Sequence, residues 1–250
     1  EAALWVNIGL NEGNRGYLSA AVENFQKALK VYQKMGSVDG EVNGHHNLGV
    51  FYVVLGEDEQ AKRHLREAIR LADTYRMLRR EAFGRTYLAN LLIYQRKLAE
   101  ARSALHRAHD LGIQLQFASL LPVVLHWQAE IARLEGQFDQ ALTLIEESLQ
   151  LAETAGYLLE KGIAWSIKGK ILDAIPHFDE AEAAHKTSLQ ILGQQYPYEV
   201  AQSQQALAEH FIMRDGLMSD RAKSLLTKAL ATFERLGAKR DVALTRALLH

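Results

Sequence analysis

The sequence is marked first by what it lacks. No cysteine occurs among its 250 residues, which excludes disulfides, thiolate nucleophiles and cysteine-ligated zinc. Only three prolines are present, so most helices can run uninterrupted. The 29 basic and 30 acidic side chains leave a formal net charge of −1, which gives no electrostatic case for nucleic acid or an anionic membrane as partner. No apolar run approaches the ~18 residues of a membrane span, so we expect a soluble, cytoplasmic protein.

Motifs of catalysis are absent as well. The chain has no G-x-x-x-x-G-K phosphate loop, no G-x-S-x-G nucleophile turn and no H-E-x-x-H metal motif. Its ten histidines raise the question of a metal site, but the pairs His45/His46 and His106/His109 have no carboxylates at matching spacing. We therefore expect no enzyme, no metal and no cofactor.

What the sequence does contain is repetition with a period of 40 residues. Small residues recur in three series that keep a constant offset from one another, which indicates the points where paired helices approach most closely. The three series are Ala21, Ala61, Ala101, Ala141 and Ala181; Gly9, Gly49, Ala89, Ala129 and Gly169; and Ala28, Ala68, Ala108, Ser148 and Ser188.

Large apolar residues fill the intervals between the small ones. Four residues after alanines of the first series come Phe25, Leu65, Leu105 and Ile145, and eight residues after them come Leu29, Ile69, Leu149 and Leu189. The spacing i, i+4, i+8 is typical of an amphipathic helix and excludes a strand. The sequence therefore predicts an all-α chain in which each copy is a pair of antiparallel helices.

These residues resemble the tetratricopeptide repeat, which has small residues at its eighth, twentieth and twenty-seventh positions. The segment from Asn47 to Tyr52, followed by Leu55, Gly56 and Ala61, matches that signature best. The resemblance implies a right-handed superhelical solenoid of about six antiparallel helix pairs plus a terminal helix. Because the period exceeds the usual ~34 residues, we expect longer helices rather than longer connections.

The repeats span the whole chain, 1–250, which we expect to be a single repeat domain. The expected copies are about 1–37, 38–77, 78–117, 118–157, 158–197 and 198–237, with a terminal helix at 239–250. The sixth copy has a turn two residues longer, at Arg214–Met218. Since the first residues already lie in repeat register and the last ones begin a new helix, we expect a fragment of a larger protein.

The resemblance also implies a concave groove lined by the first helix of each copy. Transferring the family's groove positions gives a mixed lining of amides, aromatics and charges. It comprises Asn43, His46 and Asn47; Thr86, Tyr87, Asn90 and Tyr94; His126, Trp127, Glu130 and Arg133; Ser166, Lys170 and Asp173; Gln202, Gln205 and Glu209; and Asn7 and Asn14 in the first copy.

This lining suits an extended peptide, because an asparagine amide offers both a donor and an acceptor to a peptide unit. The resemblance implies that Asn47 and Asn90 grip a bound backbone. The carboxylate clamp of chaperone adaptors is not matched, since Val6 and Leu10 stand at its lysine and asparagine positions. Alternatively, the lining residues are simply solvated, and the aromatic ones pack between neighbouring first helices.

The leading hypothesis is a non-enzymatic scaffold that binds a protein or peptide in this groove. The phrase from Phe233 to Asp241 resembles the C-terminal arms of bacterial signal-transduction ATPases such as the maltose-regulon activator MalT. That resemblance implies a sensor arm of a signalling or transcription-regulating protein, with an ATPase core outside these residues. The alternative is a small-molecule sensor, in which Tyr87, Tyr94 and Trp127 stack on a ligand such as an oligosaccharide.

Overall fold

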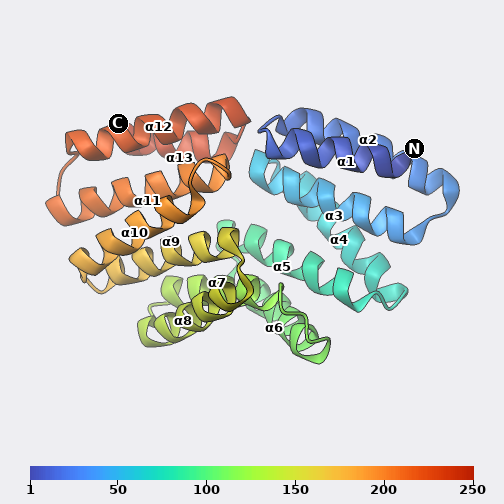
Figure 1. Cartoon of the computed structure of the whole chain (residues 1–250), viewed down its shortest axis with the longest axis horizontal. Coiled ribbons are helices and arrows are strands. Elements are labelled where there is room, and N and C mark those ends of the chain that lie inside the picture. The colour runs from blue at the N-terminus through green and yellow to red at the C-terminus, as the bar shows by residue number, and fades with distance from the viewer. The chain divides into compact units, whose positions relative to one another are not determined.

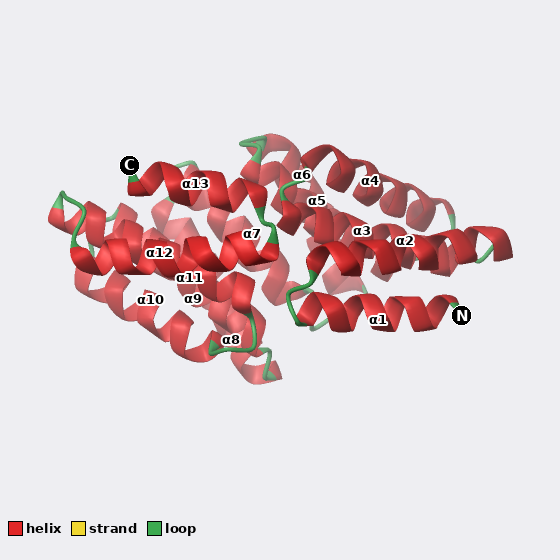
Figure 2. Cartoon of the chain, turned by 90° about the horizontal axis from the view of Figure 1, so that it is seen from above, coloured by secondary structure: helices red, strands yellow, loops and turns green.

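The computed structural model describes residues 1–250 apart from the side chain of Asn14, so the expected groove position of Asn14 lies outside the described side chains. Helices joined by short loops make up the described residues, and no strand occurs among them (Figure 2). The helices are α1 (Ala2–Asn14), α2 (Leu18–Met35), α3 (Val38–Leu55), α4 (Asp58–Thr74), α5 (Leu78–Tyr94), α6 (Leu98–Gln114), α7 (Leu121–Leu134), α8 (Phe138–Ala155), α9 (Leu158–Ala174), α10 (Phe178–Leu192), α11 (Pro197–Asp215), α12 (Asp220–Leu236) and α13 (Lys239–Leu249).

The extra length of the repeats lies largely in their helices, as expected, although α7 has only 14 residues. Helices α2, α3 and α8 have 18 residues each, and only two residues separate α2 from α3. Gly36 and Gly156 end α2 and α8 with φ angles of 64° and 72°, a left-handed conformation that glycine adopts without steric cost. The longer turn of the sixth copy joins α11 to α12, and α11 begins at Pro197, one residue before the expected start of that copy.

The small residues of the first series are buried within the helix pairs. Ala21, Ala61, Ala101, Ala141 and Ala181 are all 0% exposed. In the third series, the two serines are also fully buried and bond to the first helix of their own copy. Ser148 donates to the carbonyl of Pro122 at 2.8 Å, and Ser188 to that of Gly162 at 2.7 Å. A buried hydroxyl is thereby satisfied at the helix contact.

The chain divides into two compact units. Unit 1 comprises Glu1–Phe117 with Leu236–Arg240, and unit 2 comprises Ala118–Arg235 with Asp241–His250. In unit 1, helices α1 to α6 pack in chain order, and α3 also packs against α5 (Figure 1). Its core includes a cluster of Val53, Ala61, Leu65 and Leu91. The expectation of one domain with the stated copy bounds stays a prediction.

Unit 2 repeats this arrangement. Helices α7 to α11 pack in chain order, and the first helices α7 and α9, and α9 and α11, also contact each other. One core cluster joins α7, α8 and α9 through Ala129, Ala141, Ile145, Ile167 and Ile171. First helices of successive copies are therefore neighbours in three cases: α3 and α5, α7 and α9, and α9 and α11. Among the described residues, no helix combines the length and hydropathy needed to cross a lipid bilayer.

Candidate functional site

The first candidate surface lies in unit 1, where α3 and α5 bring Asn43, His46, Asn47, Tyr87 and Asn90 together; we call it the α3–α5 surface. The imidazole of His46 meets the ring of Tyr87 edge-on, with ring centroids 5.2 Å apart. Arg80 of α5 donates from Nη1 to Oδ1 of Asn43 at 3.4 Å and also contacts Asp39. The predicted residues of two copies thus share one surface, because the first helices pack side by side.

The amides of this surface differ in how far the protein satisfies them. Asn47 donates from Nδ2 to Oδ1 of Asn43 at 3.5 Å, a long hydrogen bond. Oδ1 of Asn90 is buried and accepts no hydrogen bond from any residue that the structure describes. A buried carbonyl oxygen normally has a donor, so Oδ1 of Asn90 is an exception on this surface.

His46 is a neutral part of the same surface. Burial lowers its pKa to about 4, and the positive charge of Arg80 adds to the effect. Its Nδ1 is buried without a hydrogen bond to a described residue. No group of three potential metal ligands occurs within the described side chains.

Tyr94, a further predicted residue of α5, lies beneath a cation of its own unit. The guanidinium of Arg240 stands 3.8 Å from the centre of the Tyr94 ring. Arg240 also donates to the carbonyl of Val53 at 2.9 Å and pairs with Asp58 at 3.1 Å. The face of the Tyr94 ring is therefore already used by a cation–π contact.

The second candidate surface lies in unit 2 and centres on Arg133 of α7. Its guanidinium binds Glu130 through two hydrogen bonds of 2.8 Å. Burial acts to lower the pKa of Arg133, but the hydrogen bond to Glu130 and the charges of Glu130, Glu209 and Asp173 outweigh it, so the net shift is upward. Since Asp173 belongs to α9 and Glu209 to α11, charges of three successive first helices converge here. We call these residues, with Gln205, the α7–α11 polar strip.

Protein hydrogen bonds already connect much of this strip. Gln205 donates to Glu209 at 2.8 Å, and Thr245 of α13 donates to Gln205 at 2.9 Å. Lys170 of α9 lies near enough for its charge to act on His185. The strip is therefore an organised, partly buried polar network with an excess of carboxylates.

Five predicted residues lie beneath the surface rather than on it. Their exposed fractions are 0% for Thr86, 1% for His126, 8% for Glu130, 7% for Ser166 and 6% for Asp173. The hydroxyl of Thr86 donates to the carbonyl of Ala82 in its own helix. His126 meets the ring of Trp127 edge-on at 4.8 Å, and burial lowers the pKa of His126 to about 3. Such residues would shape a binding surface without touching the ligand.

A polar cluster that was not expected from the sequence lies in the core of unit 2. His185 of α10 and His210 of α11 both bond to Asp173 of α9, at 2.9 Å and 2.6 Å. Only Asp173 was expected, as a groove residue. The signal for His185 was present, since it follows Ile145 by 40 residues, in the series of Phe25, Leu65 and Leu105.

Comparison with known proteins agrees with the fold. Residues 42–75 match the tetratricopeptide repeat family model. A search among curated proteins gives no match. A Rap protein complexed with competence and sporulation factor is similar, with a TM-score of 0.74 and 13% identity over 99% of this chain and 73% of that one.

Two further solved structures are also similar. NprR in complex with its cognate peptide NprX has a TM-score of 0.78 and 17% identity over 99% of this chain and 72% of its own. A signal-transduction ATPase with a tetratricopeptide repeat sensor, from Pyrococcus horikoshii, has a TM-score of 0.62 and 15% identity over 100% of this chain and 37% of its own. The expected tetratricopeptide-like helical-repeat fold is thereby confirmed, with residues 42–75 as its family-model match.

Proposed function

We propose that this tetratricopeptide-like chain is a non-enzymatic scaffold that binds an extended peptide on the α3–α5 surface. The observation that carries the proposal is the buried Oδ1 of Asn90, which accepts no hydrogen bond from a described residue. An unsatisfied buried acceptor costs about 1–3 kcal/mol. When the Asn90 amide turns toward the surface on binding, a ligand N–H recovers that free energy, and an extended peptide carries such donors at regular intervals.

The amides around Asn90 fit the same kind of ligand. Asn47 is engaged only by a long hydrogen bond to Asn43, so its amide can turn toward a ligand at little cost. Together, Asn47 and Asn90 offer donors and acceptors from two neighbouring helices, which is the requirement for holding peptide units along their edge. Rap and NprR, whose folds are similar, were solved with a competence and sporulation factor and with a cognate peptide, which supports the peptide over other ligands.

The alternative, a stacked small molecule, has less support. Each aromatic ring proposed for stacking already contacts a protein group: Tyr87 meets His46, Trp127 meets His126, and Tyr94 lies beneath Arg240. The rings of Tyr87 and Trp127 also pack against core clusters. We therefore assign them a packing role and leave the small molecule as an outcome of the test.

The test uses peptides selected from a random ten-residue display library, with affinity measured by fluorescence polarisation. The variant Asn47→Ala/Asn90→Ala should weaken binding by about 5- to 100-fold, because each lost hydrogen bond contributes about 0.5–1.5 kcal/mol. The matched control is Gln33→Ala/Gln60→Ala, which removes two exposed amides from the second helices α2 and α4. The control should bind as tightly as the unaltered protein.

Two results would contradict the proposal in different ways. Unchanged affinity of a folded Asn47→Ala/Asn90→Ala variant would show that peptides bind elsewhere. Failure to select any binding peptide, together with a melting temperature raised by a panel of oligosaccharides, would favour the small-molecule sensor, because a ligand of the folded state stabilises it by mass action.

A role as the sensor arm of a larger regulator extends this proposal. It is supported by the likeness to the signal-transduction ATPase, of which this chain covers 37%. Sequencing the reading frame on both sides of these residues tests it directly. A phosphate-loop ATPase module in the same frame is the expected result. A frame without a second domain would refute the role as a sensor arm.

A further inference from the structure

One joint between neighbouring copies has a polar core where its counterpart in unit 1 is apolar. In unit 1, Val53 of α3, Leu65 of α4 and Leu91 of α5 belong to one core cluster. These three positions join the two helices of one copy to the first helix of the next. Such a contact is held by the hydrophobic effect and does not depend on pH.

Three copies further along the chain, the corresponding residues are Asp173, His185 and His210. The first two follow Val53 and Leu65 by 120 residues, and His210 follows Leu91 by 119, since the sixth copy is shifted by one residue. Both histidines are 0% exposed, and Asp173 is 6% exposed. Ionisable groups thus replace the whole apolar set at the joint between the fifth and sixth copies.

One carboxylate holds both imidazoles. Nε2 of His185 lies 2.9 Å from Oδ2 of Asp173, and Nδ1 of His210 lies 2.6 Å from Oδ1. Because an ionised carboxylate only accepts hydrogen bonds, each of these ring nitrogens is a donor. The cluster therefore links α9, α10 and α11 through two charge-assisted hydrogen bonds.

The opposite ring nitrogens have no comparable partner. Nδ1 of His185 and Nε2 of His210 are buried and make no hydrogen bond with a described residue. His185 packs against Gly169, where an added Cβ would stand 2.6 Å from Nδ1. An added proton on this nitrogen would thus be buried against backbone without an acceptor. Nε2 of His210 is 3.9 Å from Oε2 of Glu182.

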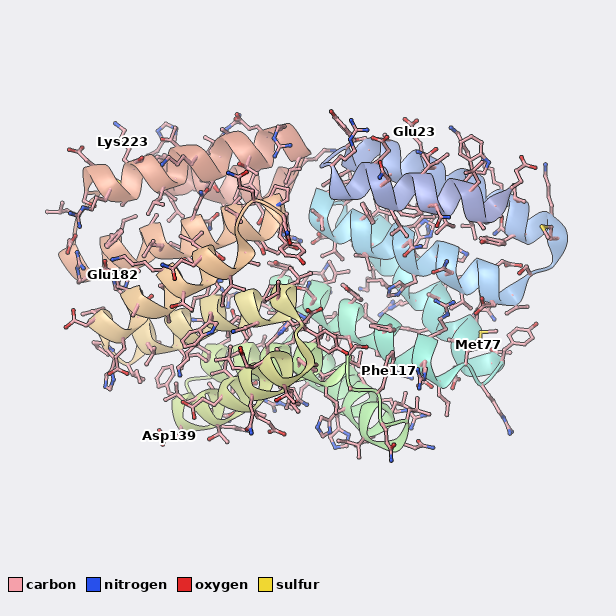
Figure 3. The ribbon with its side chains drawn as sticks, viewed as in Figure 1. Glu23, Met77, Phe117, Asp139, Glu182 and Lys223 are labelled. Atoms are coloured by element: carbon pink, nitrogen blue, oxygen red, sulfur yellow. The ribbon has the colours of Figure 1, made fainter. Side chains whose placement is uncertain are left out.

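Charged groups on α7, α9, α10 and α11 lie around this cluster. Burial lowers the pKa of His185; Asp173 opposes that shift, while Lys170 and His210 reinforce it. Glu182 of α10, seen in Figure 3, pairs with Lys186 and with Arg214 of α11. The charge of Asp173 also acts on Arg133 of α7, whose pKa it raises, and the charge of His210 acts on Asp215 of α11, whose pKa it lowers. Helices α8 and α12 contribute apolar residues to the adjoining core clusters.

We propose that the His185–Asp173–His210 cluster makes the contact between the fifth and sixth copies a pH-sensitive joint. With His185 neutral, the joint is tight. Acid adds a proton to Nδ1 of His185, which is buried without an acceptor among the described residues, and the contact opens locally. In a repeat array each copy is stabilised mainly by its neighbours, so α10 and α11 open without global unfolding. This inference stands apart from the proposed peptide binding.

The experiment is hydrogen exchange of the full chain at pH 7 and pH 5, read by mass spectrometry and expressed as protection factors. In the unaltered protein, amides of α10 and α11 should lose about tenfold in protection, the equivalent of one pKa unit of linkage. In His185→Gln/His210→Asn the amide nitrogens replace the two donors but do not titrate. Protection in α10 and α11 should then be the same at both pH values.

The histidines of unit 1 provide an internal reference. Burial lowers the pKa of His46 and of His64, each to about 4. Amides of α3 and α4 in His185→Gln/His210→Asn should therefore still lose protection when the pH falls from 7 to 5. The hydrogen bond from Lys186 lowers the pKa of Glu182, so this carboxylate does not add to the change in protection between pH 7 and pH 5. Burial raises the pKa of Glu199 on α11, which would stabilise the folded state in acid; Glu199→Gln removes that opposing effect.

Two outcomes would overturn the proposal. One is equal protection of α10 and α11 at the two pH values in the unaltered protein. The other is a loss in His185→Gln/His210→Asn as large as that of the unaltered protein. Should the double variant fail to fold, Asp173→Val/His185→Leu/His210→Leu installs the apolar residues of the unit 1 joint. If the amides of α10 and α11 in this triple variant still lose protection between pH 7 and pH 5, the proposal of a pH-sensitive joint is wrong.

Discussion

Replacing His126 by leucine should stabilise unit 2, and more so in acid. His126 is 1% exposed, and neither ring nitrogen makes a hydrogen bond with a described residue. Leucine is of similar size, so the substitution leaves no large cavity. Removal of an unsatisfied buried polar group should raise the free energy of unfolding by about 1–3 kcal/mol at neutral pH.

The pH dependence has a definite sign and size. Burial lowers the pKa of His126 from 6.5 to about 3 in the folded protein. The unfolded chain therefore binds the proton first, and stability present above pH 6.5 is lost as the pH falls from there toward 3. Between pH 7 and pH 5, the histidine should cost the folded state about 2 kcal/mol. His126→Leu should abolish that loss.

Hydrogen exchange of the α7 amides provides the local free energy of opening in the unaltered protein and the variant. The local free energy of opening is compared between pH 7 and pH 5, and its decrease should be about 2 kcal/mol smaller in His126→Leu than in the unaltered protein. His177→Gln, which removes an exposed histidine of the same unit, should leave the α7 difference unchanged. If His126→Leu and the unaltered protein lose the same stability in acid, the imidazole is not held neutral and unpartnered as described.

Two further predictions concern the packing and the turns. Ala101→Leu should lower stability by about 1–3 kcal/mol, because Ala101 is 0% exposed within the pair of α5 and α6; an unchanged melting temperature would refute the repeat register. Gly156→Ala should cost about 1–2 kcal/mol through its positive φ alone, since an added Cβ would meet no atom within 4 Å. Gly156→Asn should cost less in the same urea titration, and equal costs would contradict a purely conformational cause.

The positions of the repeats could be predicted because they follow from local rules. A period of 40 residues with apolar side chains at i, i+4 and i+8 gives amphipathic helices, and small residues at a fixed offset set where paired helices touch. Ala61 and Ala141 are fully buried for this reason. The tetratricopeptide-like fold follows from the same pattern.

The candidate site was less predictable from the sequence. Thr86 and Tyr87 are adjacent and were both expected in the groove, yet Thr86 is fully buried and Tyr87 is half-buried. Successive residues of a helix point about 100° apart, so a family position alone does not fix exposure. That Asn90 Oδ1 lacks a donor also depends on which side chains pack around it. The assignment of these residues to ligand binding stays a prediction.

The sequence by itself determined the helix pairs, their length and the series of small residues at their contacts, because each depends on a spacing along one helix. Only the tertiary structure decided that Asp173, His185 and His210 share one carboxylate, since they come from three helices and meet through side-chain rotamers. In the same way it decided that Glu209 acts on Arg133. Hydrogen bonds and charges act over a few ångströms, and which groups come that close is set by packing.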